Sequence, residues 1–135
     1  MSVLQMFDTN YILALIDPRS EERDKARLAL DPTLETVVSC VAYGEAWEGL
    51  CRGRPEKTAK KRKNFEAVIA SLRVLWLDNE TLQRFHDLFW QLCRQGTPIP
   101  ANDIWIAALC LQHDAILITD DFDFKQVPGL KIRSW

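Results

Sequence analysis

The segment Val3-Leu4-Gln5-Met6-Phe7-Asp8 decides the fold, because it is a short apolar run that ends at an acidic residue. Such a run predicts a short buried strand. Acidic residues stand in similar places further along: Glu45 follows the run that begins at Val37, Asp103 opens Ile-Trp-Ile-Ala-Ala-Leu, and Asp120-Asp121 follow Ala-Ile-Leu-Ile-Thr. Because residues that follow strands converge at the carboxyl edge of a parallel sheet, these acidic residues are expected to share one small volume.

Strands and helices alternate along the chain. The expected strands span residues 3–7, 36–39, 74–77, 116–119 and 130–133. The expected helices lie between them, at about 9–16, 20–30, 40–53, 56–72, 79–95 and 102–113. This alternation predicts an α/β fold with a mainly parallel central sheet flanked by helices. The length of 135 residues fits one domain, residues 1–135.

The composition argues against several classes of protein. No apolar run approaches the roughly 20 residues that cross a bilayer, and the first residues lack the basic start of a signal peptide, so we expect a cytoplasmic protein without membrane contact. The four cysteines form no Cys-x-x-Cys pair and are expected to be buried free thiols. His86 and His113 lack metal-ligand spacing, and no Gly-rich phosphate loop is present.

Each acidic residue taken alone has an ordinary role. Asp8 and Asp103 fit helix N-termini, and Glu45 fits a solvated helix face. Asp120-Asp121 fit a turn. Brought together, however, carboxylates repel one another unless they are protonated or bridged by a cation. Ligation by oxygen alone suits Mg²⁺ or Mn²⁺, and sites of that kind perform phosphoryl transfer or phosphodiester hydrolysis.

Four motifs carry a resemblance to a known family. They are Asp8-Thr9-Asn10 after an apolar strand, Ser39 followed by Glu45 in a helix, Thr97-Pro-Ile-Pro-Ala-Asn-Asp-Ile-Trp-Ile-Ala-Ala108, and Ile118-Thr-Asp-Asp-Phe-Asp-Phe124. In order, spacing and local sequence the chain resembles a PIN-domain protein of the VapC toxin type. The resemblance implies a PIN-like three-layer fold and a Mg²⁺- or Mn²⁺-dependent endoribonuclease, the toxin of a toxin–antitoxin pair, which a small antitoxin protein inhibits.

By that resemblance, Asp8, Glu45 and Asp103 match the family's three principal acidic residues, and Asp121 matches a less regular fourth. Asp8 and Asp103 are expected to ligate the cation, and Glu45 to ligate it or to orient water. Strand alternation would send Asp120 and Asp121 to opposite sides, so Asp120 is expected to cap the following turn. The residues expected to support the site, with caps and turns as their alternative roles, are Thr9, Asn10, Asn102, Thr119 and Asp120.

Two surface features suggest partners. One is a basic block that could follow an RNA backbone, with a solvated surface or antitoxin contact as alternatives: Arg52, Arg54, Lys57, Lys60, Lys61 and Lys63. The other is a set of aromatic residues that could pack in the core or face a second copy or a partner helix: Trp76, Phe85, Phe89 and Trp90. The chain is therefore expected to bind RNA and an antitoxin, and to form a homodimer.

Two other functions stay open as alternatives. A metal-dependent phosphatase of the haloacid-dehalogenase type also gathers aspartates at strand ends, but it needs Asp-x-Asp where this chain has Asp8-Thr9-Asn10. A catalytically silent PIN-like module that binds RNA or protein would not need all four carboxylates. The expected function is therefore a ribonuclease that hydrolyses RNA phosphodiester bonds with a divalent cation.

Overall fold

The computed structural model describes residues 3–135 and contains a five-stranded sheet. The strands are β1 (Leu4–Phe7), β2 (Glu35–Ser39), β3 (Arg73–Leu75), β4 (Ala115–Ile118) and β5 (Lys131–Arg133), in the spatial order β3-β2-β1-β4-β5. Every neighbouring pair is parallel, which confirms the predicted α/β class. The strand order reverses between β1 and β4, and open parallel sheets bind ligands at such a switch point.

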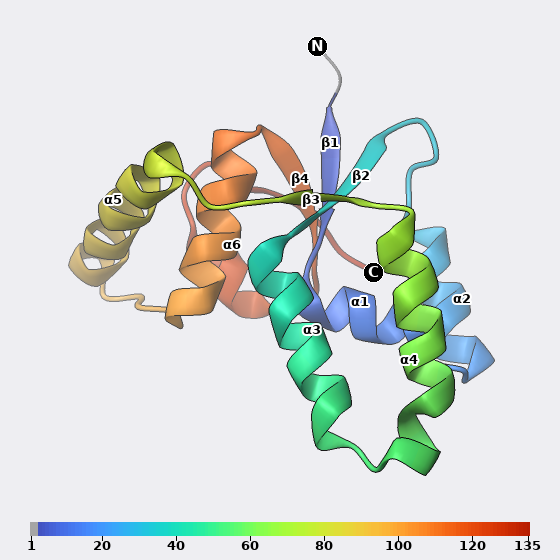
Figure 1. The fold of residues 1–135 in the computed structure, drawn as a ribbon. Helices are drawn as coiled ribbons and strands as arrows, with labels where there is room; N and C mark the ends of the chain where they lie inside the picture. The colour runs from blue at the N-terminus through green and yellow to red at the C-terminus, as the bar shows by residue number, and fades with distance from the viewer. Residues whose placement is uncertain (1–2) are drawn as a thin grey trace.

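Helices cover both faces of the sheet, as Figure 1 shows. They are α1 (Thr9–Ile16), α2 (Ser20–Leu28), α3 (Cys40–Arg52), α4 (Pro55–Ala70), α5 (Asn79–Gln95), α6 (Ala101–Gln112) and the short 3-10 helix η1 (Phe122–Gln126). In Figure 1, α5 and α6 lie at one side of the sheet and α1, α2 and α4 at the other, while α3 packs against both α1 and α6. Within residues 3–135, no helix has the length and apolar character needed to span a membrane.

The central strands end at the same level. Phe7 of β1 pairs with Val38 of β2 and with Ile118 of β4, and the backbone N–H of Asp8 donates to the carbonyl of Ile118 at 3.3 Å. The side chains of Asp8 and Thr119, which follow these strands, therefore meet at the carboxyl edge although they are far apart in the sequence.

The apolar runs of the sequence form the core. Met6, Val37 and Leu117 are fully buried, because a parallel sheet with helices on both faces leaves neither face in water. Tyr11 of α1 and Phe124 of η1 are buried as well. Phe124 thereby fixes the segment that follows β4 against the rest of the protein.

Two expectations, one about the end of a strand and one about buried cysteines, are wrong. The third strand was expected to reach Leu77, but β3 ends at Leu75, and the Trp76 side chain that follows is 71% exposed. Leu75 pairs with Ser39, the last residue of β2, so a longer edge strand would have no partner. The cysteines were all expected to be buried, whereas Cys51 and Cys93 are exposed.

Candidate metal centre

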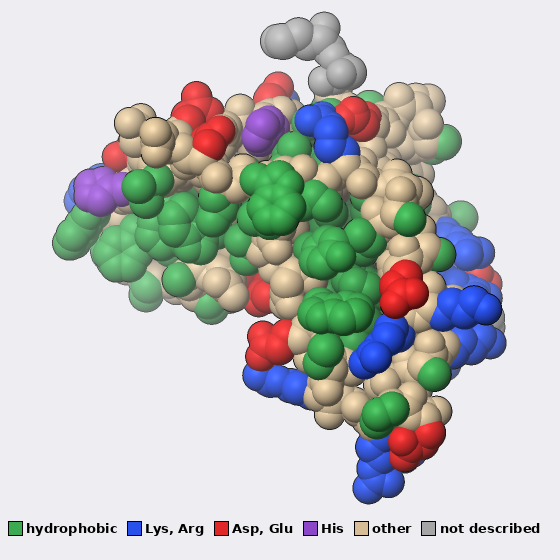
Figure 2. Space-filling view, viewed as in Figure 1, with side chains coloured by type: hydrophobic (Ala, Val, Ile, Leu, Met, Phe, Trp, Pro, Cys, Tyr) green, Lys and Arg blue, Asp and Glu red, His purple; other side chains and the backbone are tan. Residues whose placement is uncertain are grey.

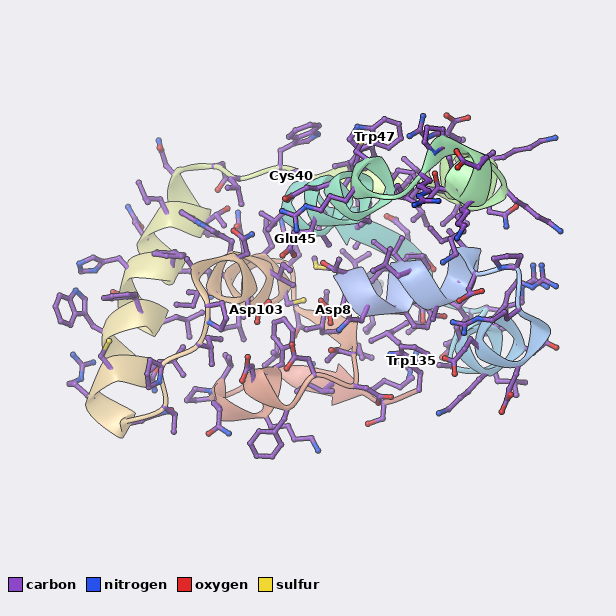
Figure 3. All side chains as sticks on the ribbon, turned by 90° about the horizontal axis from the view of Figure 1, so that it is seen from below. Asp8, Cys40, Glu45, Trp47, Asp103 and Trp135 are labelled. Atoms are coloured by element: carbon purple, nitrogen blue, oxygen red, sulfur yellow. The ribbon has the colours of Figure 1, made fainter. Side chains whose placement is uncertain are left out.

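Acidic side chains surround a cavity of about 490 Å³ at the carboxyl edge of the sheet. Figure 3, seen from below, shows Asp8, Glu45 and Asp103 around one space between α1, α3 and α6. The residues that line the cavity are Asp8, Thr9, Asn10, Glu45, Pro100, Ala101, Asn102, Asp103, Asp121 and Asp123. The four carboxylates expected from the sequence are thus brought together, and a fifth joins them.

Asp8 follows β1 and caps α1. Its Oδ1 accepts a hydrogen bond from the backbone N–H of Thr9 at 2.7 Å, and its Oδ2 accepts one from the Thr119 hydroxyl at 2.7 Å. Burial raises the pKa of Asp8 from 3.8 to about 6, against the lowering effect of these hydrogen bonds, and Asp121 and Glu45 add repulsion. The carboxylate is held in one orientation, but its charge is unfavourable without a cation.

Glu45 reaches the same space from α3. Its Oε1 accepts a hydrogen bond from the Thr9 hydroxyl at 2.8 Å, and its Oε2 accepts a longer one from the Asn102 side-chain amide at 3.4 Å. Thr9 therefore binds two of the carboxylates, Asp8 through its backbone and Glu45 through its hydroxyl. The sequence predicted that Thr9, Asn102 and Thr119 support the site, and each of them donates a hydrogen bond to one of its carboxylates. In a metal site, donors of this kind fix the orientation of the ligands.

Asp103 lies in the first turn of α6, where the helix dipole favours a negative charge. Nevertheless its pKa is raised from 3.8 to about 7, first by burial and then by repulsion from the neighbouring carboxylates, of which Asp121 and Asp8 contribute most. The charged form of Asp103 is therefore unfavourable near neutral pH unless a counter-charge is present.

The raised pKa values predict that the metal-free protein is less stable at pH 8 than at pH 5. The unfolded value is 3.8 and the folded values are about 6 for Asp8 and about 7 for Asp103, so their stabilising effect is complete below pH 3.8 and is lost as the pH rises through 6 and 7. Over the whole titration the loss should be about 3 kcal/mol for buried Asp8, of which about half falls between pH 5 and pH 8. The loss per unit of pKa shift should be smaller for Asp103, which is partly exposed.

Chemical denaturation in EDTA at several pH values measures this loss. Asp103→Asn removes one of the two titrating groups and should flatten the profile between pH 6 and 8. Asp17, whose pKa is lowered to about 2 by hydrogen bonds from Arg19, titrates well below this range. A free energy of unfolding that increases steadily from pH 5 to pH 8 would contradict the prediction.

The segment after β4 supplies two carboxylates. Thr119 accepts a hydrogen bond from the Asp121 backbone N–H at 3.0 Å, and Asp121 Oδ1 accepts one from the Asp123 backbone N–H at 2.9 Å, which begins η1. One carboxylate oxygen each from Asp103, Asp121 and Asp123 lie within 4.8 Å of one another. The sequence analysis did not place Asp123 in the site, although the Asp-Asp-Phe-Asp run contained it.

The predicted role of Asp120 is wrong. The sequence predicted that it caps the turn after β4 and supports the site, but Asp121 caps η1. The Asp120 carboxylate accepts a hydrogen bond from the backbone N–H of Trp135 at 3.1 Å and does not line the acidic cavity. Asp121 lines the cavity and Asp120 does not, as strand alternation predicted, but the 3-10 helix begins at Phe122, directly after Asp121, so Asp121 caps it instead of Asp120. Asn10 does line the cavity, at its exposed rim.

The basic block lies on the hairpin formed by α3 and α4, and Figure 2 shows Lys and Arg side chains gathered around that end of the molecule. No member of the block lines the acidic cavity. Lys61, which is partly buried, lines a neighbouring cavity of about 420 Å³, and Asn10 lines both cavities. Lys60 and Lys63 are exposed, and Arg52 pairs with Glu48. Lys61 therefore lines the cavity next to the acidic one, whereas the other members of the block line neither of these two cavities.

The donor set suits a hard divalent cation. Every polar side chain that lines the acidic cavity offers carboxylate, hydroxyl or amide oxygens, which are the ligands that Mg²⁺ and Mn²⁺ prefer. The cavity has no Lys, Arg or His lining side chain among the described residues. The negative charge is consequently left without a protein counter-charge at the site, and a divalent cation would supply it.

Comparison with known proteins agrees with this geometry. The family model of the PIN domain matches residues 6–130. The chain is 26% identical over 134 residues to "Ribonuclease VapC1" of Haemophilus influenzae (strain R2866), with 98% of each chain covered. It is 26% identical over 135 residues to "tRNA(fMet)-specific endonuclease VapC" of Salmonella typhimurium, with 96% of each covered.

Solved structures show the same fold. The structure of VapBC-1 from nontypeable Haemophilus influenzae is similar with a TM-score of 0.80 at 26% identity, over 98% of each chain. VapBC2 from Rickettsia felis, bound to a DNA fragment from its promoter, gives a TM-score of 0.82 at 21% identity, over 98% of this chain and 99% of that one. With the family model matching residues 6–130, the chain belongs to the PIN-domain family.

Proposed function

We propose that this protein is a Mg²⁺- or Mn²⁺-dependent endoribonuclease and the toxin of a toxin–antitoxin pair. The observation that carries the proposal is the convergence of Asp8, Glu45, Asp103 and Asp121, from four distant segments, on one oxygen-lined cavity. The relatives named ribonuclease and endonuclease are similar over nearly their full length, which supports RNA as the substrate. The similar VapBC structures support a cognate antitoxin as partner.

The cavity residues have distinct tasks in this function. When bound, a divalent cation neutralises the anionic phosphodiester and lowers the pKa of the attacking water. Asp8, Asp103 and Asp121 would hold the cation, and Glu45 would hold it or orient the water. Thr9 and Thr119 keep Asp8 in position through their hydrogen bonds. The acidic residues do this without acting as nucleophiles themselves.

The experiment that tests the function compares two substrates. Purified protein with Mn²⁺ is incubated with structured RNA and, separately, with a small phosphomonoester such as p-nitrophenyl phosphate. We expect cleavage of the RNA and no release of phosphate from the monoester. Hydrolysis of the monoester alone would favour the phosphatase, and cleavage of neither would favour a silent binding module.

Lys61 is the member of the basic block that best fits an RNA contact, because it lines the cavity next to the acidic one. Lys61→Gln should reduce the slope of log K against log salt for RNA binding by about one, because one phosphate contact is lost. The matched control is Lys63→Gln, an exposed lysine on the same helix. Filter binding at several salt concentrations measures the slope for the wild type and for both variants. If Lys61→Gln has the same slope as the wild type, Lys61 belongs to a solvated surface and does not contact RNA.

We also propose that the protein forms a homodimer through an aromatic face, defined as Trp47, Trp76, Leu82, Phe89 and Trp90. Figure 2 shows a broad band of hydrophobic side chains across α5, β3 and α3, and Trp76 and Trp90 are 71% and 49% exposed. The four aromatic side chains alone expose roughly 400–500 Å². That is at least about half of the ~800 Å² which each partner buries in a standard interface.

A charge introduced into the aromatic face should dissociate the dimer. Sedimentation equilibrium of the wild type is expected to give twice the chain mass of 15.6 kDa, and Trp76→Glu with Trp90→Glu should give the single mass. Leu28→Glu on α2, an exposed leucine outside this face, is the control and should remain dimeric. A monomeric wild type whose antitoxin binding is lost in the Trp76→Glu, Trp90→Glu variant would assign the face to the antitoxin instead.

A further inference from the structure

We propose that Phe122 and Lys125, on the exposed side of η1, bind the RNA substrate next to the acidic cavity: an RNA base stacks on the Phe122 ring, and the Lys125 ammonium contacts a phosphate of the same strand. Neither residue lines the acidic cavity itself. Proteins bind single-stranded nucleic acid with this combination, in which bases stack on aromatic rings and cationic side chains follow the backbone. The inference rests on the proposed ribonuclease function and adds a substrate contact to it.

The three sides of η1 have different surroundings. Residues three positions apart lie on the same side of a 3-10 helix. Phe124 and Val127, the residue directly after η1, are buried, and Asp123 lines the acidic cavity. The third side carries Phe122, which is 65% exposed, and Lys125, which is also exposed. Because the buried side fixes the helix, the Phe122 ring is held in water on a fixed turn.

The two exposed side chains already lie together. The Lys125 Nζ is 5.6 Å from the centroid of the Phe122 ring, within the ~6 Å range of a cation–π contact. No carboxylate within residues 3–135 forms a salt bridge with Lys125. The ammonium is therefore available to a phosphate, and the exposed area of the ring is available to a base.

The place of Phe122 in the chain carries the argument, because a single exposed apolar side chain is common on protein surfaces. Its neighbours on both sides, Asp121 and Asp123, line the acidic cavity. Consecutive Cα atoms are only ~3.8 Å apart, so the ring lies at the edge of the proposed cleavage site. A base near the cleaved bond can therefore reach it.

The pair lies on the other side of the acidic cavity from Lys61. In Figure 3, η1 lies below the space around Asp8 and Asp103, and α4, which carries Lys61, lies above it. The acidic cavity repels a phosphate until a cation is bound, so a strand that crosses it needs attractive contacts outside it. Lys61 on one side and Phe122 with Lys125 on the other would supply them.

The proposed dimer does not use this pair. The aromatic face lies over α3, α5 and β3, and β3 is one edge strand of the sheet. In contrast, η1 lies between β4 and β5 in the chain, and β5 is the opposite edge strand. The antitoxin is the other candidate for contact with Phe122, and the experiment below separates it from RNA.

The test is single-turnover cleavage of a labelled structured RNA at a series of protein concentrations, which gives the half-saturating concentration and the maximal rate separately. Phe122→Ala should raise the half-saturating concentration by about tenfold, because one stacked base is lost, and should leave the maximal rate nearly unchanged. Phe122→Leu is the matched variant: it keeps an apolar side chain without a ring and should be as weak as Phe122→Ala. Phe122→Trp should restore wild-type binding.

The dependence on salt separates the two contacts. Lys125→Gln should reduce the slope of log K against log salt by about one, because one phosphate contact is lost. Phe122→Leu should weaken binding at every salt concentration with an unchanged slope, since stacking on a neutral ring releases no counterion. Lys131→Gln is the control, because Lys131 pairs with Asp114, and it should keep the wild-type slope.

The outcomes separate this inference from the proposed function. If the wild type cleaves RNA and Phe122→Leu keeps its half-saturating concentration, no base stacks on the ring: the inference is wrong and the ribonuclease function stands. If the wild type cleaves no RNA, both fall. Loss of antitoxin binding in Phe122→Ala with unchanged RNA binding would assign Phe122 to the antitoxin and overturn the inference. Thermal melts of each variant verify that the protein is folded.

Discussion

Excess EDTA is expected to lower the rate of RNA cleavage by about a thousandfold or more. A divalent cation at a phosphodiester supplies several kcal/mol of charge stabilisation in the transition state, and each ~1.4 kcal/mol is a factor of ten in rate. Nothing else in the described part of the cavity can replace it, because its lining offers no imidazole, ammonium or guanidinium group. The measurement is single-turnover cleavage of a labelled RNA before and after chelation.

A ribonuclease can also cleave RNA without a metal by using a histidine imidazole as general base, so the positions of the two histidines test this alternative. His86 lies on α5, where its Nε2 accepts a hydrogen bond from the Trp90 indole at 3.2 Å, and His113 is the C-cap of α6. Neither lines the acidic cavity. Activity should therefore return when Mn²⁺ or Mg²⁺ is added in excess of EDTA, and full activity in EDTA alone would refute the mechanism.

Much of the fold follows from the sequence because its local signals agree with the tertiary structure. Short apolar runs that end at Asp8, Ser39 and Thr119 give strands that end at the same level, and this register brings distant carboxylates together. The error at Trp76 and Leu77 has a different origin. Their apolar character predicted that the strand continues through them, but the length of an edge strand depends on its partner, and β2 ends at Ser39.

The site residues that lie next to strands and helices could be predicted from the sequence, and those in the irregular segment after β4 could not. Asp8, Glu45 and Asp103 follow or lie beside regular elements, so their convergence could be expected from the topology. Asp120 and Asp123 lie in a short segment whose path depends on a capping hydrogen bond and on burial of Phe124. No periodic pattern encodes such a path, and this is why the prediction for Asp120 was wrong and Asp123 was left out.

Asp103→Asn is expected to lower kcat for RNA cleavage by about a thousandfold, with the protein still folded. The substitution keeps the shape of the side chain but removes a charge from the proposed metal ligands, and several kcal/mol of transition-state stabilisation should be lost with the cation. In EDTA at pH 8 the same variant should be more stable than the wild type by about 1–2 kcal/mol, because burial and repulsion raise the pKa of Asp103 and make its charged form unfavourable.

The combination of lost activity and gained stability distinguishes a metal ligand from a structural residue, whose replacement would lower both. Asp120→Asn is the control, since its carboxylate contacts Trp135 outside the cavity, and it should retain most of the cleavage rate. RNA cleavage assays measure the turnover of the two variants, and urea denaturation measures their free energy of unfolding. Wild-type turnover in folded Asp103→Asn would remove this residue from the catalytic set, and a larger loss for Asp120→Asn would mean that the loop after β4 presents its other aspartate to the RNA.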